Sequence, residues 1–306
     1  MNATGKFAGF TVGLVVIFGA ALALGSVAGP DVAEPAAHST GDAAHSTGDD
    51  GHGAAGHDVA GHDAVADPTP GGLTPTADGY TLELAADQIT AGPAVPVQFR
   101  ITDPSGVPVT DYTEEHEKPL HLIVVRRDLA GFQHVHPTLD ASGTWTVPLD
   151  VARGGDYRVF ADFTPAGGDG LTLGTDLRVA GTYDPQPLPA PTPTATVDGY
   201  TVTLDGAIRP GETSNVTLSV SRDGQPVTDL QPYLGAYGHL VALRTTDLGY
   251  LHVHPDGHPG DGGAGPGIDF AVTAPSAGDY RLFLDFQHAG VVHTAEFTVT
   301  AGPEEE

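Results

Sequence analysis

The sequence has no cysteine, and its one methionine is Met1. The absence of cysteine excludes disulfides, thiolate zinc sites and catalysis by a thiol. Methionine sites for Cu(I) are excluded as well, so metal ligands must come from histidine, carboxylates or backbone oxygen. Basic residues are also scarce: the chain has 12 basic and 39 acidic residues, which gives a net charge of −27. Nucleic acid is therefore not expected as a partner, because phosphate contacts need clustered lysine and arginine.

Helical periodicity is missing too, whereas 42 glycines and 26 prolines are present. This composition favours short strands joined by turns. The sequence also lacks a nucleophile motif, a glycine-rich phosphate loop and a pair of catalytic carboxylates. We therefore expect a protein that is not an enzyme. A copper or iron oxidase with three histidines and an open coordination position is the alternative that would contradict this expectation.

Residues 1–28 have the features of an export signal. Residues 7–24 carry no charge and are about long enough to cross a bilayer, and Ser26-Val27-Ala28 has the small residues of a cleavage site. Either an uncleaved anchor or a cleaved signal peptide fits this pattern, and the length favours the anchor. In both cases we expect the remaining chain at the cell envelope or secreted, with membrane contact only through residues 7–24.

Residues 29–77 contain too few apolar side chains to offset the entropy of ordering, so we expect a disordered stalk. The stalk contains five histidines, of which the last two each precede an aspartate: His38, His45, His52, His57 and His62. Such tracts bind divalent metals weakly and without fixed geometry. The stalk is either a soluble spacer or a device for metal capture, and the number of histidines favours capture.

Two related segments follow, residues 78–180 and 198–300, separated by a proline-rich linker at 181–197 and followed by an acidic tail at 301–306. In the first repeat we expect strands at 95–101, 121–126, 131–136, 144–149, 157–163 and 171–179. Many short strands separated by turns indicate a β-sandwich. A Gly-Asp-Tyr tripeptide before a long apolar strand in each repeat is typical of the tyrosine corner of immunoglobulin-like domains. The expected fold is all-β, with two tandem immunoglobulin-like β-sandwich domains.

Each repeat carries a lone histidine followed by the motif His-Val-His-Pro. The expected metal ligands of these motifs are His121, His134, His136, His239, His252 and His254. Two histidines separated by one residue lie on the same face of a β-strand. The alternative is that they are ordinary residues at the end of a half-buried sheet. This pattern predicts a divalent ion, Cu(II) or Zn(II), as the partner. It does not identify a protein partner.

The register of the predicted hairpin decides whether the third histidine joins the other two. If the turn is centred in residues 127–130, His121 lies opposite His136 and Ile123 lies opposite His134. Opposed side chains have Cβ atoms about 5 Å apart, close enough to share a metal ion. A shift by one residue would move His121 to the other face.

The same count places His239 opposite His254 in the second repeat. This repeat also has His288 and His293 around a turn, where the first repeat has no histidine. We therefore rank the second repeat as the richer site.

Acidic residues near these motifs have two interpretations. Residues 114–117 of the first repeat are either a source of carboxylate ligands or a solvated loop. Asp162 and Asp285 are out of phase with the apolar face of their strands, so they are either hydrogen-bond partners of the metal ligands or exposed, and the pattern favours exposure.

The stretch Pro119-Leu-His-Leu-Ile-Val-Val-Arg-Arg-Asp-Leu-Ala-Gly-Phe-Gln-His-Val-His-Pro137, followed by Gly155-Asp-Tyr-Arg-Val-Phe-Ala-Asp-Phe163, resembles exported bacterial proteins with YtkA-like or FixH-like domains. Residues 238–297 resemble the same group. The resemblance implies immunoglobulin-like modules that handle heavy metals, copper in particular. The sandwich is also similar in outline to periplasmic copper carriers of the CopC type. Their ligands do not carry over, because this chain has no histidine at a mature N-terminus.

These observations predict an exported, non-catalytic protein for metal capture or homeostasis at the cell envelope. The alternative is an extracellular adhesion or assembly module in which the histidines are structural.

Overall fold

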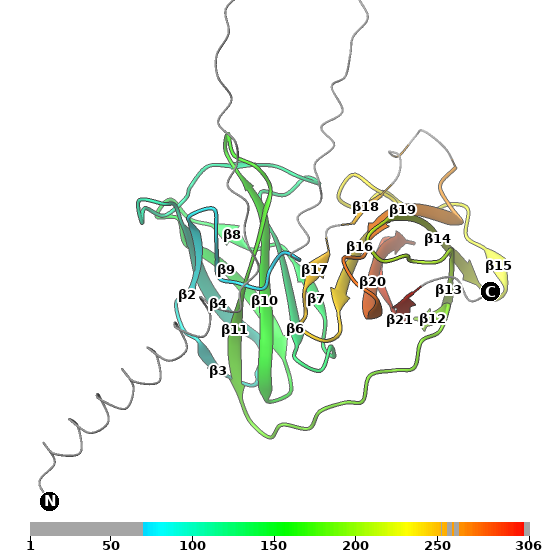
Figure 1. Cartoon of the computed structure of the whole chain (residues 1–306), viewed down its shortest axis with the longest axis horizontal. Helices are drawn as coiled ribbons and strands as arrows, with labels where there is room; N and C mark the ends of the chain where they lie inside the picture. The colour runs from blue at the N-terminus through cyan, green and yellow to red at the C-terminus, as the bar shows by residue number, and fades with distance from the viewer. Residues whose placement is uncertain (1–69, 252, 256–258, 260–262, 303–306) are drawn as a thin grey trace, which may run out of the picture. The chain divides into compact units, whose positions relative to one another are not determined.

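The computed structural model describes residues 70–251, 253–255, 259 and 263–302 (Figure 1). The predicted export segment, most of the predicted stalk with its five histidines, and His252 lie outside the described residues. The described residues form strands and turns, and among them no helix is long and apolar enough to cross a membrane. Both repeats lie in one compact unit.

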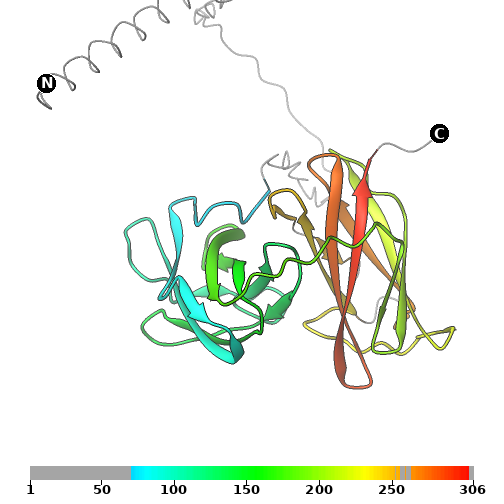
Figure 2. The ribbon, with the colours of Figure 1, turned by 90° about the horizontal axis from the view of Figure 1, so that it is seen from below.

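The first repeat is built from two sheets (Figures 1 and 2). One sheet has the order β1 (Thr76–Ala77), β2 (Tyr80–Leu84), β4 (Gly92–Thr102), β9 (Trp145–Val151) and β8 (Thr138–Leu139). The other has the order β3 (Gln88–Thr90), β11 (Leu171–Ala180), β10 (Gly155–Pro165), β6 (His121–Arg126) and β7 (Gln133–Val135), with β5 (Tyr112–Thr113) paired to β10.

The second repeat has the same two-sheet plan. Its first sheet has the order β12 (Thr194–Val197), β13 (Tyr200–Asp205), β14 (Thr213–Arg222), β19 (Gly267–Thr273) and β18 (His254–Pro255), with β15 (Gln225–Pro226) paired to β14. Its second sheet has the order β17 (Tyr250–Leu251), β16 (Gly238–Arg244), β20 (Gly278–His288) and β21 (Val291–Ala301).

Each repeat has its own apolar core, formed by side chains that alternate along the strands. In β9 the buried and less buried positions follow each other strictly, and Trp145 at its start stacks on Phe99 with ring centroids 6.2 Å apart. The Tyr157 hydroxyl donates to the Arg153 carbonyl at 2.9 Å, and the Tyr280 hydroxyl donates to the Ser276 carbonyl at 2.8 Å. These bonds are the predicted tyrosine corners, and the prediction of tandem immunoglobulin-like sandwiches is confirmed.

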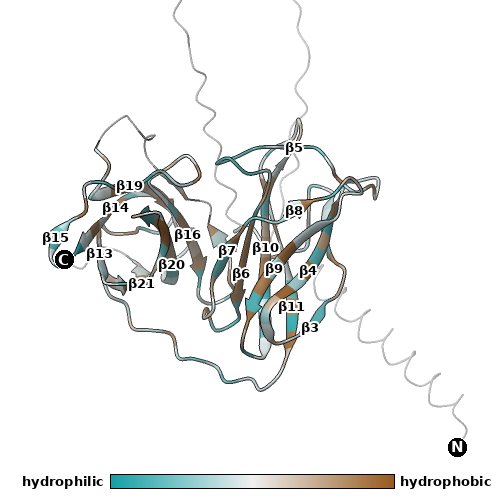
Figure 3. Cartoon of the chain, turned by 180° about the vertical axis from the view of Figure 1, so that it is seen from behind, coloured by the Kyte–Doolittle hydropathy of each residue, from teal (hydrophilic) through white to brown (hydrophobic). Residues whose placement is uncertain are grey.

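Strand β6 departs from alternation, because all six of its residues are buried. One face lies in the core of the first repeat, and the other packs on the second repeat in a third apolar cluster. The members of this inter-repeat cluster are Ile123, Val125, Leu129, Phe132, Phe160, Val241, Leu243, Leu248, Tyr250 and Phe283. Colouring by hydropathy marks the apolar character of the strands that supply it (Figure 3). The cluster joins the two repeats and positions the ends of β6 and β16.

Candidate metal centre

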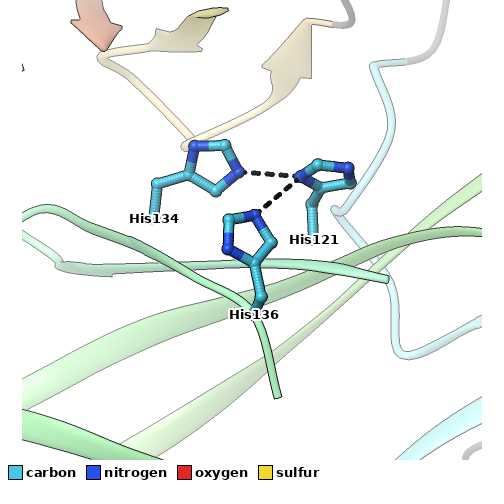
Figure 4. Close-up of side chains that lie close together, drawn as sticks. All are labelled: His121, His134 and His136. Atoms are coloured by element: carbon cyan, nitrogen blue, oxygen red, sulfur yellow. Dashed lines mark hydrogen bonds between the residues drawn. The ribbon is translucent and has the colours of Figure 1, made fainter. Parts of the chain in front are cut away.

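The hairpin of β6 and β7 has the predicted register, with Ile123 opposite His134. Continuing this count outward brings His121 level with His136, on the same face as His134. Figure 4 shows the three imidazole rings pointing toward one another. The structure therefore brings together His121, His134 and His136, which are called the histidine triad below.

The ring nitrogens of the triad are close enough to share one ion. His121 Nδ1 lies 2.9 Å from His134 Nε2 and 3.2 Å from His136 Nε2 (Figure 4). The three candidate ligand atoms all lie within 4.8 Å of one another, and no other group of three or more such residues is found in the described part of the chain.

Hydrogen bonds on the outer side of two rings define their tautomers. His121 Nε2 lies 3.0 Å from the Glu115 carbonyl, which can only accept, so Nε2 carries the proton and Nδ1 has the lone pair. His134 Nδ1 lies 2.8 Å from Asp285 Oδ2, so its Nε2 has the lone pair when the ring is neutral. A neutral pair therefore directs two lone pairs at each other across 2.9 Å. A cation bound between the two nitrogens would remove the repulsion between these lone pairs.

Burial keeps these imidazoles in the form that binds metals. Burial lowers the pKa of His121 to about 4, against the opposing effect of its bond to the Glu115 carbonyl. Burial, with the neighbouring His134, lowers the pKa of His136 to about 3. Burial also lowers the pKa of His239 to about 4. All three rings are therefore neutral at pH 7, with a lone pair available.

Two further histidine rings lie beside the triad. The His239 ring centroid is 6.4 Å from that of His134, and the His116 centroid is 5.1 Å from that of His239. A small cavity of about 40 Å³ is lined by histidines from both repeats, His116, His121, His134 and His239. His116 lies in the acidic segment 114–117, whose sequence indicated only carboxylate ligands or a solvated loop. Its position shortly before β6, whose first residue is His121, was the signal that could have identified it.

The prediction that Asp162 and Asp285 are exposed is wrong. Asp285 is only 4% exposed and accepts hydrogen bonds from His134 and from the Thr294 hydroxyl. Asp162 is partly buried and accepts from the hydroxyls of Thr172 and Tyr250. The strand pattern predicted exposure because each sheet was assumed to face solvent on its outer side, whereas the other repeat covers that side.

The second repeat reproduces only part of the first. His239 Nε2 donates to the Tyr233 carbonyl at 2.8 Å, the counterpart of the bond from His121 to Glu115. The second hairpin has the predicted register, with Leu243 opposite Tyr250, and the backbone of His254 pairs with Ala271 of β19. Because His252 and the side chain of His254 lie outside the described part of the chain, the predicted cluster of His239, His252 and His254 stays a prediction. The chain has already crossed to the other sheet at this position.

His288 and His293 lie away from His239. His293 pairs with Phe286, a core residue, whereas His239 pairs with the adjacent Asp285, so the two histidines are on opposite faces of the sheet. His293 Nδ1 lies 2.8 Å from Asp198 Oδ2. His288 lies 2.7 Å from the Tyr200 hydroxyl and 3.1 Å from Asp229 Oδ1. Among the described residues the group of three histidines is therefore in the first repeat, whereas His288 and His293 do not join His239.

Comparison with solved structures finds bacterial proteins with low similarity. The FdeC adhesin of Escherichia coli aligns at 16% identity over 74% of this chain and 65% of its own, with a TM-score of 0.24. InvD of Yersinia pseudotuberculosis aligns at 16% identity over 75% and 59%, with a TM-score of 0.25. A putative membrane anchored protein of Corynebacterium diphtheriae aligns at 15% identity over 74% and 60%, with a TM-score of 0.21. The aligned part spans less than two thirds of each of these chains, and TM-scores this low carry no functional argument.

Sequence comparison found no match among curated proteins. One family model, described as a domain of unknown function (DUF8832), matches residues 75–181 and again residues 195–302. The description assigns no activity, so the metal handling implied by the YtkA-like and FixH-like resemblance stays a prediction. The two matches together cover well over half of the chain, which therefore belongs to the DUF8832 family and carries two copies of its domain.

Proposed function

We propose that this chain is an exported, non-catalytic protein that binds Cu(II) or Zn(II) at the histidine triad. One observation carries the proposal: three ring nitrogens, from β6, from β7 and from the residue directly after β7, converge within 4.8 Å of one another. The bonds to Glu115 and Asp285 support it, because they direct the lone pairs of His121 and His134 inward.

The distances are compatible with a bound ion. Two metal–nitrogen bonds of about 2.0–2.1 Å place their nitrogens about 2.8–3.0 Å apart at the square-planar angle of Cu(II) and about 3.3–3.4 Å apart at the tetrahedral angle of Zn(II), a range of about 2.8–3.4 Å. The separations of 2.9 Å and 3.2 Å from His121 Nδ1 fall in this range. Neutral imidazole suits both Cu(II) and Zn(II), and the cysteine-free sequence leaves nitrogen and oxygen as the donors.

The sequence features outside the described residues fit a capture role. An export signal would place the triad at the cell envelope, and a stalk with five histidines would raise the local metal concentration through weak binding. The triad would then be the site of defined geometry to which the ion passes.

The test compares two pairs of histidines in one protein. His134→Ala with His136→Ala removes two triad ligands, whereas His288→Ala with His293→Ala removes a pair that the structure places elsewhere. All variants carry serine at the five stalk histidines, so that weak stalk binding does not mask the result. Titration calorimetry with Zn(II) and Cu(II) on untagged protein should show one site per chain, lost in the triad variant and kept in the control. Equal binding by both variants would contradict the proposal.

An adhesion or assembly module is the second candidate function. The tandem immunoglobulin-like sandwiches favour it, because such domains commonly present binding surfaces outside the cell. The histidines would then be structural. In that case His134→Ala with His136→Ala should lower the free energy of unfolding by the same amount with and without metal, and Zn(II) should not stabilise the unaltered protein.

A further inference from the structure

The histidine triad belongs to the first repeat, but one of its hydrogen-bond partners belongs to the second. Asp285 lies in β20, and its Oδ2 accepts from His134 Nδ1 across the boundary between the repeats. We infer that the metal site is shared: Asp285 is a positioning residue for His134, and metal binding therefore strengthens the docking of the two repeats. This inference rests on the proposed function.

Hydrogen bonds hold the buried Asp285 carboxylate in this contact. It is 4% exposed, and burial of a charged carboxylate is costly unless hydrogen bonds compensate for the lost water. Oδ1 accepts from the Thr294 hydroxyl at 2.6 Å, and Oδ2 accepts from His134 at 2.8 Å. The bond to Thr294 stays within the second repeat, so His134 is the partner that ties Asp285 to the first repeat.

The contact acts on the ligand nitrogen through the ring. A carboxylate that accepts from one imidazole nitrogen fixes the tautomer and the ring orientation, and it makes the other nitrogen a stronger donor to a metal. In His134 that other nitrogen is Nε2, which faces His121 Nδ1 at 2.9 Å. Without Asp285 the proton of His134 is free to move to Nε2, and the ring is free to turn away.

The same hairpin strand also makes apolar contacts with the second repeat. The Phe132 ring stacks on the Phe283 ring with centroids 3.9 Å apart and an interplanar angle of 5°. Phe132 and His134 are two residues apart, and Phe283 and Asp285 are two residues apart. The apolar and polar contacts therefore form and separate together. Because coupling between two binding events is reciprocal, an ion that prefers an oriented His134 also favours the docked repeats.

The corresponding aspartate of the first repeat has a different partner. Asp162 of β10 occupies the position of Asp285 in the repeated strand, and it accepts from the Tyr250 hydroxyl at 3.0 Å. Tyr250 stands where the first repeat has Phe132. The repeats have thus taken different roles, in which the first supplies the ligands and the second supplies the carboxylate that orients one of them.

The test uses a matched pair of aspartates on one strand. Asp285 and Asp279 both lie in β20 and both accept from a cross-strand threonine hydroxyl at 2.6 Å, but only Asp285 also contacts a histidine of the first repeat. In the full chain with serine at the stalk histidines, Asp285→Ala should weaken Zn(II) binding about 10–100-fold. Asp285→Asn, which keeps an acceptor, should weaken it less, and Asp279→Ala should leave it within about twofold.

A second measurement is the tautomer of His134 in metal-free protein. The ¹⁵N chemical shifts of its ring should show the Nδ1–H tautomer in the unaltered chain and in Asp279→Ala. In Asp285→Ala they should show a mixture of the Nδ1–H and Nε2–H tautomers. A purely structural role of Asp285 would not change this ratio. If the unaltered chain binds no metal, the proposed function and the inference both fall. If it binds metal with an affinity that Asp285→Ala leaves unchanged, only the inference is overturned.

The coupling to docking is measured with spin labels, for which the cysteine-free sequence is convenient. Val107→Cys and Val291→Cys place one label on each repeat at positions that are 57% and 54% exposed. Zn(II) should narrow the distribution of distances between the labels in the otherwise unaltered chain, and it should narrow it less in Asp285→Ala. A distribution that Zn(II) does not change, in a chain that binds Zn(II), contradicts the coupling.

Discussion

The two repeats share a scaffold, but among the described residues a histidine triad comes together only in the first repeat. In both, the first histidine of a central strand donates to a carbonyl six residues earlier, and a tyrosine corner opens the next long strand. The chain after the hairpin differs, because His254 belongs to β18 and pairs with the other sheet, whereas its counterpart His136 lies between β7 and β8. A duplicated motif therefore preserves the hairpin register without fixing the residue at which the chain enters the other sheet.

The largest expected effect tests whether the repeats are docked at all. Phe160 and Phe283 occupy corresponding strands and are fully buried in the inter-repeat cluster. Truncation of either to alanine should lower the free energy of unfolding by about 3–5 kcal/mol, because it leaves a cavity in a packed region. Urea denaturation of the full chain measures this, with Val291→Ala, 54% exposed, as the control. A small effect for both phenylalanines would indicate independent repeats.

The next prediction concerns pH. Burial lowers the pKa of His121 to about 4, of His136 to about 3 and of His239 to about 4, whereas an unfolded histidine titrates near 6.5. Below pH of about 6.5 the unfolded chain therefore binds more protons than the folded chain, and stability falls as the pH drops toward 4.

Metal-free protein should show this loss in urea midpoints measured from pH 7 to pH 4. His136→Ala should remove the contribution of His136 and leave that of His121, and His239→Ala should remove the contribution of the second repeat. A midpoint that does not respond to either substitution would show that these rings are not buried in their neutral form. The same low pKa values predict that metal binding persists below pH 6.5, because fewer protons compete for the ligand nitrogens.

A smaller effect on stability is expected when Asp162, the counterpart of Asp285 in the first repeat, loses its hydrogen bond to Tyr250. Tyr250→Phe removes the hydroxyl that donates to Asp162 Oδ2 and should cost about 1–3 kcal/mol, because a partly buried carboxylate loses a partner. The substitution recreates the phenylalanine of the first repeat, so the ring packing is kept. Metal affinity should not change, because the hydrogen bond from Tyr250 to Asp162 does not involve a ring of the histidine triad. A loss of affinity in Tyr250→Phe would show that the carboxylates of both repeats serve the site.

The strands and the first hairpin were predictable because they depend on short-range pattern. Strand β6 begins and ends where the apolar run predicted, and the His121 to His136 register followed from turn position and alternation. The burial of Asp285 was not predictable, since alternation within one strand does not reveal that a second domain covers the outer face. The position of His254 was also missed, because the residue at which a strand changes sheets depends on packing around the loop that follows.

The smallest expected effect tests the part that the repeats share. Tyr157→Phe and Tyr280→Phe each remove one hydroxyl that donates to a backbone carbonyl four residues earlier. Each should lower the free energy of unfolding by about 0.5–1.5 kcal/mol, the usual net value of one hydrogen bond. The two losses should be similar, because the corner precedes the divergence of the repeats, and neither should change Zn(II) affinity. Unequal losses in urea denaturation would mean that the divergence extends into the scaffold, since Tyr280 also lies 3.3 Å from the Ser276 hydroxyl and would then depend on that second contact.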